Sequence, residues 1–141
     1  MVTFPLLLQT FVPTGGVPGV SQTREVADLR LVYLNHELAF SLSRIAKSDS
    51  LFTNFHQGAQ ARLVDPAHIP ASCLTAAKKI ISQHLSLFEK ANYSLDFMFM
   101  ESGEPILIEM NTTPGFDLLL YVGTPALREE YLGKLIDSMF E

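Results

Sequence analysis

The chain is poor in cysteine and has no charged residue near its start. Cys73 is the sole cysteine among 141 residues, which excludes an internal disulfide and makes an intracellular, cytoplasmic protein the expectation. Residues 1–23 carry no charge, but Pro5, Pro13 and Pro18 interrupt them, so they predict neither a membrane helix nor a signal peptide. A net charge of −5 argues against nucleic acid as a partner. We therefore expect a protein that binds neither membranes nor nucleic acids.

Charge is distributed unevenly along the sequence. Hydrophobic residues make up 48% and charged residues 18%, which is typical of a globular chain, and the length fits one domain spanning residues 1–141. Residues 93–141 contain nine acidic and two basic side chains, whereas residues 1–92 contain six acidic and eight basic ones. This pattern indicates an acidic segment able to hold a cation, preceded by a mildly basic segment able to meet an anion.

The pattern of apolar residues predicts an α+β fold in which helices cover an antiparallel sheet. Asn35-His36 suits a two-residue hairpin turn, and Pro125 suits the first position of a helix. The glycine- and proline-rich stretch 13–22 predicts a loop. The expected elements are, in order, a strand at 4–12, a hairpin at 28–34 and 37–44, a structured loop at 51–58, a helix from Pro66 or Pro70 to about Ala91, a hairpin at 93–100 and 105–111, and a helix from Pro125.

Three oxygen-bearing side chains interrupt the second, otherwise apolar hairpin. If residues 100 and 105 pair across its turn, Asp96 lies opposite Glu109, and Asn111 shares the face of Glu109. Two carboxylates about 5 Å apart at an effective dielectric of about 20 repel by about 3 kcal/mol, so the pair needs a cation or a shifted pKa. Carboxylate and amide oxygens are hard ligands that suit Mg²⁺. The alternative is that both carboxylates simply face solvent at the rim of the sheet.

Arg44 ends an apolar row on the first hairpin. Leu38, Phe40 and Leu42 precede it at alternate positions, so all four side chains are expected on one face of the strand. The arginine then either extends to solvent at the strand end or reaches an anion held against the sheet.

Four segments of the sequence together resemble ATP-grasp ligases, and they occur in the order expected for that family. The second hairpin, whose aspartate is followed by IEMNTTPGF, resembles the metal-binding end of these enzymes. The other similarities are LLLQTFVP to the strand leading into the adenine-binding hinge, DLRLVYLNHELAFSLSRIAK to the D-x-R hairpin of the RimK-like and glutathione-synthetase-like branches, and LFTNFHQGA to their T-N-x-H-x-G-G loop. These segments cover most of residues 5–120.

The resemblance implies a role for each matching residue. Asp96, Glu109 and Asn111 match the magnesium ligands of the family, with manganese as an alternative metal. Arg30 and Arg44 match the hairpin arginines that act in catalysis, and Arg44 is expected to face the phosphates or an acyl-phosphate intermediate. The implied nucleotide-binding residues are Gln9, Thr10, Phe11 and Val12 of the hinge and Asn54 of the loop that borders the acceptor site.

The resemblance also implies a reaction. In such enzymes a carboxylate attacks the γ-phosphate of ATP, and an amine then displaces phosphate from the resulting acyl phosphate. The protein supplies positioning and charge neutralisation around the triphosphate. The implied cofactors are ATP and magnesium, and the implied partners are a small-molecule or peptide carboxylate and an amine.

The sequence departs from the family pattern at several positions. It has no lysine before Lys47, whereas the ATP-binding lysines of the family precede the hinge. Phe52 and Gln57 stand where relatives often carry arginine, and Ala59 replaces the second loop glycine. We therefore expect the chain to be the C-terminal half of an ATP-grasp fold, without the N-terminal domain and the first grasp subdomain. Such a portion should be inactive alone, and it should self-associate through the surface that the missing subdomain leaves exposed. The alternative is a non-catalytic nucleotide-binding or interaction module derived from such a protein.

Overall fold

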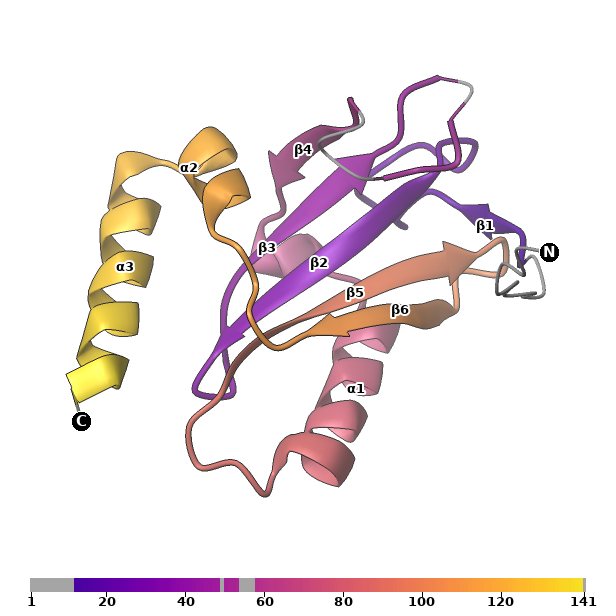
Figure 1. The fold of residues 1–141 in the computed structure, drawn as a ribbon. Coiled ribbons are helices and arrows are strands. Elements are labelled where there is room, and N and C mark those ends of the chain that lie inside the picture. Colours follow the sequence, from indigo (N-terminus) through magenta and orange to yellow (C-terminus); the bar gives the residue numbers. More distant parts are fainter. Residues whose placement is uncertain (1–11, 49, 54–57, 141) are drawn as a thin grey trace, which may run out of the picture.

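The computed structural model describes residues 12–48, 50–53 and 58–140, and it has the expected α+β architecture of an antiparallel sheet covered by helices (Figure 1). Its strands are β1 (Thr14–Gly15), β2 (Ala27–Leu34), β3 (Glu37–Ile45), β4 (Gln60–Leu63), β5 (Asn92–Met100) and β6 (Pro105–Asn111). Its α-helices are α1 (Ala71–Ile80), α2 (Asp117–Val122) and α3 (Pro125–Phe140). The strand expected at 4–12 lies outside the described residues, apart from Val12.

The two long hairpins lie side by side in one sheet. Its strands follow the order β1-β5-β2-β3-β4, β6 pairs with β5, and every pairing is antiparallel. β2 pairs with β5, so the first strand of one hairpin contacts the first strand of the other. Within the described part of the chain, β6 forms an edge of the sheet beside the strand that carries Asp96.

The face of the sheet beneath β2 and β5 packs against α1. Side chains point alternately to the two faces of a strand, and Leu31, Leu95 and Phe97 share the face that α1 covers. Cys73 and Ala77 of α1 are fully buried against them. Burial raises the pKa of the Cys73 thiol to about 12, so this cysteine is a packing residue.

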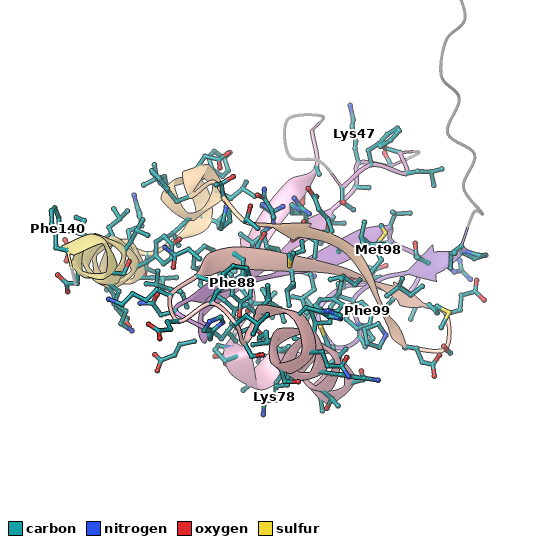
Figure 2. The ribbon with its side chains drawn as sticks, turned by 60° about the horizontal axis from the view of Figure 1, so that its bottom comes forward. Lys47, Lys78, Phe88, Met98, Phe99 and Phe140 are labelled. Carbon is teal, nitrogen blue, oxygen red and sulfur yellow. The ribbon has the colours of Figure 1, made fainter. Side chains whose placement is uncertain are left out.

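The opposite face packs against α2 and α3, but only over one end of the sheet. Figure 2 shows α1 below the sheet and α2 above it, and it shows Met98 and Phe99 pointing to opposite faces of β5. The rings of Phe40 and Tyr131 of α3 pack in a T-shaped arrangement with a centroid distance of 5.1 Å. The buried residues of this second core are Val32, Phe40, Leu42, Leu118, Leu119 and Tyr131.

The turn of the β2–β3 hairpin is the predicted one. Asn35 and His36 have φ values of 51° and 67°, and two successive positive values are what a type I′ turn requires. Both predicted strands are present, and their observed bounds differ from the predicted ones by one residue.

A bulge in β3 corrects one expected face. Val32 pairs with Phe40, but Tyr33 pairs with Leu38, which leaves Ala39 as the extra residue. Leu38 therefore packs against the core between the sheet and α1, whereas Phe40 belongs to the core on the opposite face of the sheet. Strict alternation, which would put both on one face, fails because of this single residue.

The helix α1 is shorter than the sequence predicts. It begins directly after Pro70 but ends at Ile80 rather than near Ala91, and a π-helical turn at Ile81–Leu85 follows. Ser82 donates a hydrogen bond of 3.0 Å from its hydroxyl group back to a main-chain carbonyl. Such bonds compete with regular helical hydrogen bonding, so the serine here favours an irregular end.

Three elements, β1, β4 and α2, have no counterpart in the predicted order. The start of α3 is confirmed, because Thr124 accepts a hydrogen bond of 3.2 Å on its Oγ1 from the main-chain N–H of Leu127, as an N-cap residue does. None of the helices in the described part of the chain combines the length and hydrophobicity that a membrane crossing requires.

We expect opposite effects from alanine at two glycines. A Cβ at Gly16 would overlap the main-chain carbonyl oxygen of Gln22, whereas one at Gly133 of α3 would meet no atom within 4 Å. Gly16→Ala should lower the free energy of unfolding by about 1–3 kcal/mol through overpacking. Gly133→Ala should raise it by about 0.5–1 kcal/mol through helix propensity. Urea denaturation measures both, and a neutral Gly16→Ala variant would contradict the observed close approach.

Candidate functional site: a buried cluster of four charges

Four charged side chains meet on the sheet face opposite α1, and we call them the four-charge cluster: Asp28, Arg30, Arg44 and Asp96. Asp28 and Arg30 alternate along β2, so they share a face. The strand pairing places Arg44 of β3 opposite Asp28, and Asp96 of β5 opposite Arg30. Each acidic side chain therefore has a basic one directly across the sheet.

Hydrogen bonds connect all four members of the cluster. Arg30 donates from Nε and Nη2 to the two carboxylate oxygens of Asp96, at 2.8 and 2.7 Å. Arg44 bridges the two acids, because its Nη2 lies 2.6 Å from Asp28 and 2.7 Å from Asp96. Its Nε also donates to both oxygens of Asp28, at 3.0 and 3.1 Å. Thr53 completes the set by donating a 2.7 Å hydrogen bond from its hydroxyl group to Asp28.

The cluster is nearly removed from solvent. Asp28 and Asp96 are 3% and 2% exposed, and the side chains of Arg30 and Arg44 are 12% and 13% exposed. Burial raises the pKa of Asp28 above its ordinary value, although the hydrogen bonds from Arg44 and Thr53 act in the opposite direction. Burial disfavours the charged form of Arg44, but its hydrogen bonds to Asp28 and the charges of both acids more than compensate and raise its pKa. The four charges thus stabilise one another at a desolvated position.

The bulge at Ala39 brings the first pair of charges into register. Beyond it, the β2–β3 pairing is shifted by one residue, and Arg44 lies opposite Asp28. Without the bulge, Asp28 would lie opposite Ser43, and the arginine would point to the apolar core under α1. The extra residue is therefore what turns Arg44 toward a carboxylate.

A second bulge, in the β5–β6 hairpin, also sets which residues lie opposite each other. Pro105 pairs with Phe99, one residue away from the predicted register, and the extra residue Ile108 restores that register further along. The predicted pairing of Asp96 with Glu109 is consequently confirmed.

Glu109 and Asn111 differ from Asp96 in their surroundings. Glu109 is exposed, whereas Asn111 is partly buried and accepts a 2.9 Å hydrogen bond on Oδ1 from the main-chain N–H of Thr113. Asn111 pairs with Ser94 of β5, whose buried hydroxyl group has no hydrogen-bond partner within the described part of the chain.

A pocket of ≈ 370 Å³ lies over the cluster. Its polar wall is formed by the cluster together with Glu109, and its apolar wall by residues of β5, β6 and the segment 50–53. The lining residues are Asp28, Arg30, Arg44, Leu51, Phe52, Thr53, Asp96, Met98, Ile108 and Glu109.

The pocket brings together four of the residues singled out from the sequence: Arg30, Arg44, Asp96 and Glu109. Val12 is described but does not line the pocket, and Asn111 lies two cross-strand pairs beyond Glu109. The remaining predicted nucleotide-binding residues, Gln9, Thr10, Phe11 and Asn54, lie outside the described residues.

Arg44 does not extend to solvent, which was one of the two sequence-based expectations, because its side chain is largely buried. In this structure its partners are carboxylates of its own sheet. The guanidinium groups also supply the positive charge beside Asp96 that the sequence analysis sought in a metal or a shifted pKa. Asp28 and Thr53 were not among the predicted site residues. The alternation of Asp28 with Arg30 in the D-x-R motif is the signal that could have identified the first of them.

The described residues, taken by themselves, contain no group of three or more His, Cys, Asp and Glu side chains placed to hold a metal ion. Within this part of the chain, a metal at this position would therefore be held by two carboxylates at most, with other oxygen donors completing its coordination.

Removing Arg44 should destabilise the fold strongly. Arg44→Met leaves Asp28 buried, with Thr53 as its remaining partner, and we expect the free energy of unfolding to fall by about 3–5 kcal/mol. Arg24→Met removes the same charge from an exposed position and should change it by less than about 0.5 kcal/mol. Adding Asp28→Asn to Arg44→Met should recover part of the loss. Equal effects of the two arginine variants in urea denaturation would contradict a stabilising cluster.

Comparison with known proteins gives one partial similarity. No protein-family model matches the chain. A stretch of 65 residues is 37% identical to the D-alanine–D-alanine ligase of Sodalis glossinidius (strain morsitans). The matched stretch covers 45% of this chain and 18% of that ligase. At a coarse level the match supports the resemblance to ATP-grasp, ATP-dependent carboxylate–amine ligases. The antiparallel sheet with its helices is compatible with the C-terminal half of an ATP-grasp fold.

Proposed function

We propose that the chain is the ATP- and magnesium-binding portion of a carboxylate–amine ligase of the peptide-bond-forming type, related to the RimK-like and glutathione-synthetase-like branches. The observation that carries the proposal is the pair Asp96–Glu109 beside Arg30 and Arg44 in the wall of one pocket. Phosphoryl transfer from ATP to a carboxylate needs cationic groups around the phosphates and fixed positions for the reacting groups. The partial similarity to a ligase supports the same assignment.

The donor set fits magnesium. Asp96, Glu109 and Asn111 would supply two carboxylates and an amide oxygen, and Mg²⁺ commonly keeps several waters and binds one or two protein carboxylates plus substrate phosphates. The hydroxyl group of Ser94 lies across from Asn111 and has no hydrogen-bond partner among the described residues, so it is a suitable contact for such a water. A bound magnesium ion would neutralise phosphate charge and polarise the phosphoryl group.

The other walls of the pocket suit the remaining parts of a nucleotide. Arg30 and Arg44 can direct guanidinium N–H groups toward phosphate oxygens, a geometry that arginine favours. Met98 and Ile108 offer apolar surface to a flat base. The carboxylate and amine substrates would approach the phosphate end. D-alanine, named in the similar ligase, is a reasonable first carboxylate to test.

A second candidate function is a non-catalytic nucleotide-binding or interaction module. One observation favours it: both arginines are already paired with carboxylates of the same sheet, so their charges are neutralised. Release of phosphate from ATP by the chain in the presence of magnesium, a carboxylate and an amine would exclude the module and would also overturn the expectation that the chain is inactive alone. Binding of magnesium–ATP without phosphate release is expected of both candidates.

Glu109→Gln gives a clean test of the metal site. Because Glu109 is exposed and lies outside the four-charge cluster, its replacement leaves the arginine pairs intact. In wild type, Mg²⁺ at about 100 times its Kd should add about 2.7 kcal/mol to the free energy of unfolding. The variant should lose most of this gain while keeping its metal-free stability. Asp96→Asn is less suitable, because it also weakens the contacts with Arg30 and Arg44.

Glu101→Gln is the matched control, since it removes the same charge from an exposed turn that does not line the pocket. Thermal unfolding with and without Mg²⁺ measures the response of each variant. If Glu109→Gln and the control respond to Mg²⁺ as wild type does, the metal assignment is wrong.

A further inference from the structure

The charges around the pocket leave a net excess of negative charge. Three carboxylates, those of Asp28, Asp96 and Glu109, meet two guanidinium groups, those of Arg30 and Arg44. An anionic ligand placed here would meet a net charge of −1 and would be repelled. A divalent cation would reverse the sign to +1. The affinity of the pocket for anions should therefore depend on the metal.

Asp28 is the main hydrogen-bond partner of Arg44. It accepts three of the four hydrogen bonds that Arg44 donates within the cluster, including the shortest one at 2.6 Å. It is buried, and Thr53 fixes it with a further hydrogen bond. Asp28 also lines the pocket, but its carboxylate is engaged by Arg44 and Thr53, and its position opposite Arg44 neutralises the arginine.

The order of the strands separates Asp28 from the metal ligands. Glu109 is on β6, Asp96 on β5, Asp28 on β2 and Arg44 on β3, in that spatial order. Although the β2 backbone lies between β5 and β3, the guanidinium group of Arg44 reaches Asp96, at 2.7 Å. A phosphate group beside a metal on Asp96 and Glu109 could therefore also contact Arg44.

We propose that Asp28 keeps Arg44 from binding anions until a divalent cation neutralises the acidic side of the cluster, so that metal and triphosphate bind with positive coupling. The proposal rests on the function proposed above, and it adds a counter-charge that makes triphosphate binding conditional on the metal. Asp28 is a positioning residue here, because it acts on the ligand only through Arg44. The coupling is reciprocal, so bound triphosphate must also tighten metal binding.

The test is calorimetric titration of the full chain with inorganic tripolyphosphate, first in metal-free buffer and then with excess Mg²⁺. Wild type should bind weakly without metal and at least about tenfold more tightly with it, because one divalent ion reverses the sign of the local charge. Asp28→Asn should bind tripolyphosphate at least about tenfold more tightly than wild type in metal-free buffer. Its further gain from Mg²⁺ should be correspondingly smaller.

Two variants separate this effect from net charge and from unfolding. Glu101→Gln removes one negative charge away from the pocket and should leave metal-free binding unchanged. If Asp28→Asn does not fold, Thr53→Val removes the hydrogen bond that fixes Asp28 and should shift metal-free binding in the same direction, by a smaller factor.

The outcomes separate the two proposals. Equal metal-free affinities of wild type and Asp28→Asn, or equal gains for Asp28→Asn and Glu101→Gln, overturn the role of Asp28. A wild-type chain that binds tripolyphosphate equally well with and without Mg²⁺ overturns the coupling. Absence of any Mg²⁺ response in the thermal unfolding of wild type counts against the proposed function itself, independently of the result for Asp28.

Discussion

The sheet is built around the need to satisfy four charges that are withdrawn from water at the same time. A buried carboxylate or guanidinium group is costly unless its partner is in place, and here each aspartate has an arginine directly across a strand. Arg44 is the connecting member, since it bonds both acids and thereby links β3 to β2 and β5. Such a network contributes little net stability compared with an apolar core, but it strongly disfavours any other register. The alignment of the two hairpins is therefore specified electrostatically as well as by packing.

This constraint divides one face of the sheet into two regions. At one end the outward-facing residues are apolar, and α2 and α3 cover them with Leu118, Leu119 and Tyr131. At the other end the same strands carry the four-charge cluster, and a pocket lies above it instead of a helix. The covered end anchors the strands, so the charged end can keep fixed side-chain positions beside an open cavity. Preorganised polar groups of this kind are what anion and metal recognition require.

The elements that depend on local pattern are predictable from the sequence, and those that depend on a single inserted residue are not. The turn at Asn35-His36 and the pairing of Asp96 with Glu109 follow from turn chemistry and alternation. The bulges at Ala39 and Ile108 leave no local signature that separates them from regular strand, yet each decides which face the following residues occupy. The partner of Arg44 was missed for this reason.

The remaining contacts of the cluster are long-range. Arg30 and Asp96 are 66 residues apart in sequence, and their pairing depends on the two hairpins lying side by side, which no local signal specifies. Thr53 reaches Asp28 from a segment that has neither helical nor strand periodicity. The sequence pattern therefore identifies most of the charged groups of the pocket but not the ion pairs that they form with one another.

The observed pairing changes the meaning of the carboxylate pair on the β5–β6 hairpin. From the sequence, Asp96 and Glu109 looked like equivalent charges in need of one cation. In the structure they are unequal: Asp96 is buried and shared by two arginines, whereas Glu109 is exposed on the edge strand. Glu109 is thus available to a metal, whereas Asp96 already pairs with two arginines. A metal bound to Asp96 would bring a divalent charge close to Arg30 and Arg44. Repulsion between these cations would weaken the hold of Asp96 on the arginines, which would then attract an anion more strongly. Under the proposed function, the same four charges would stabilise the sheet in the absence of ligands and respond to a metal in its presence.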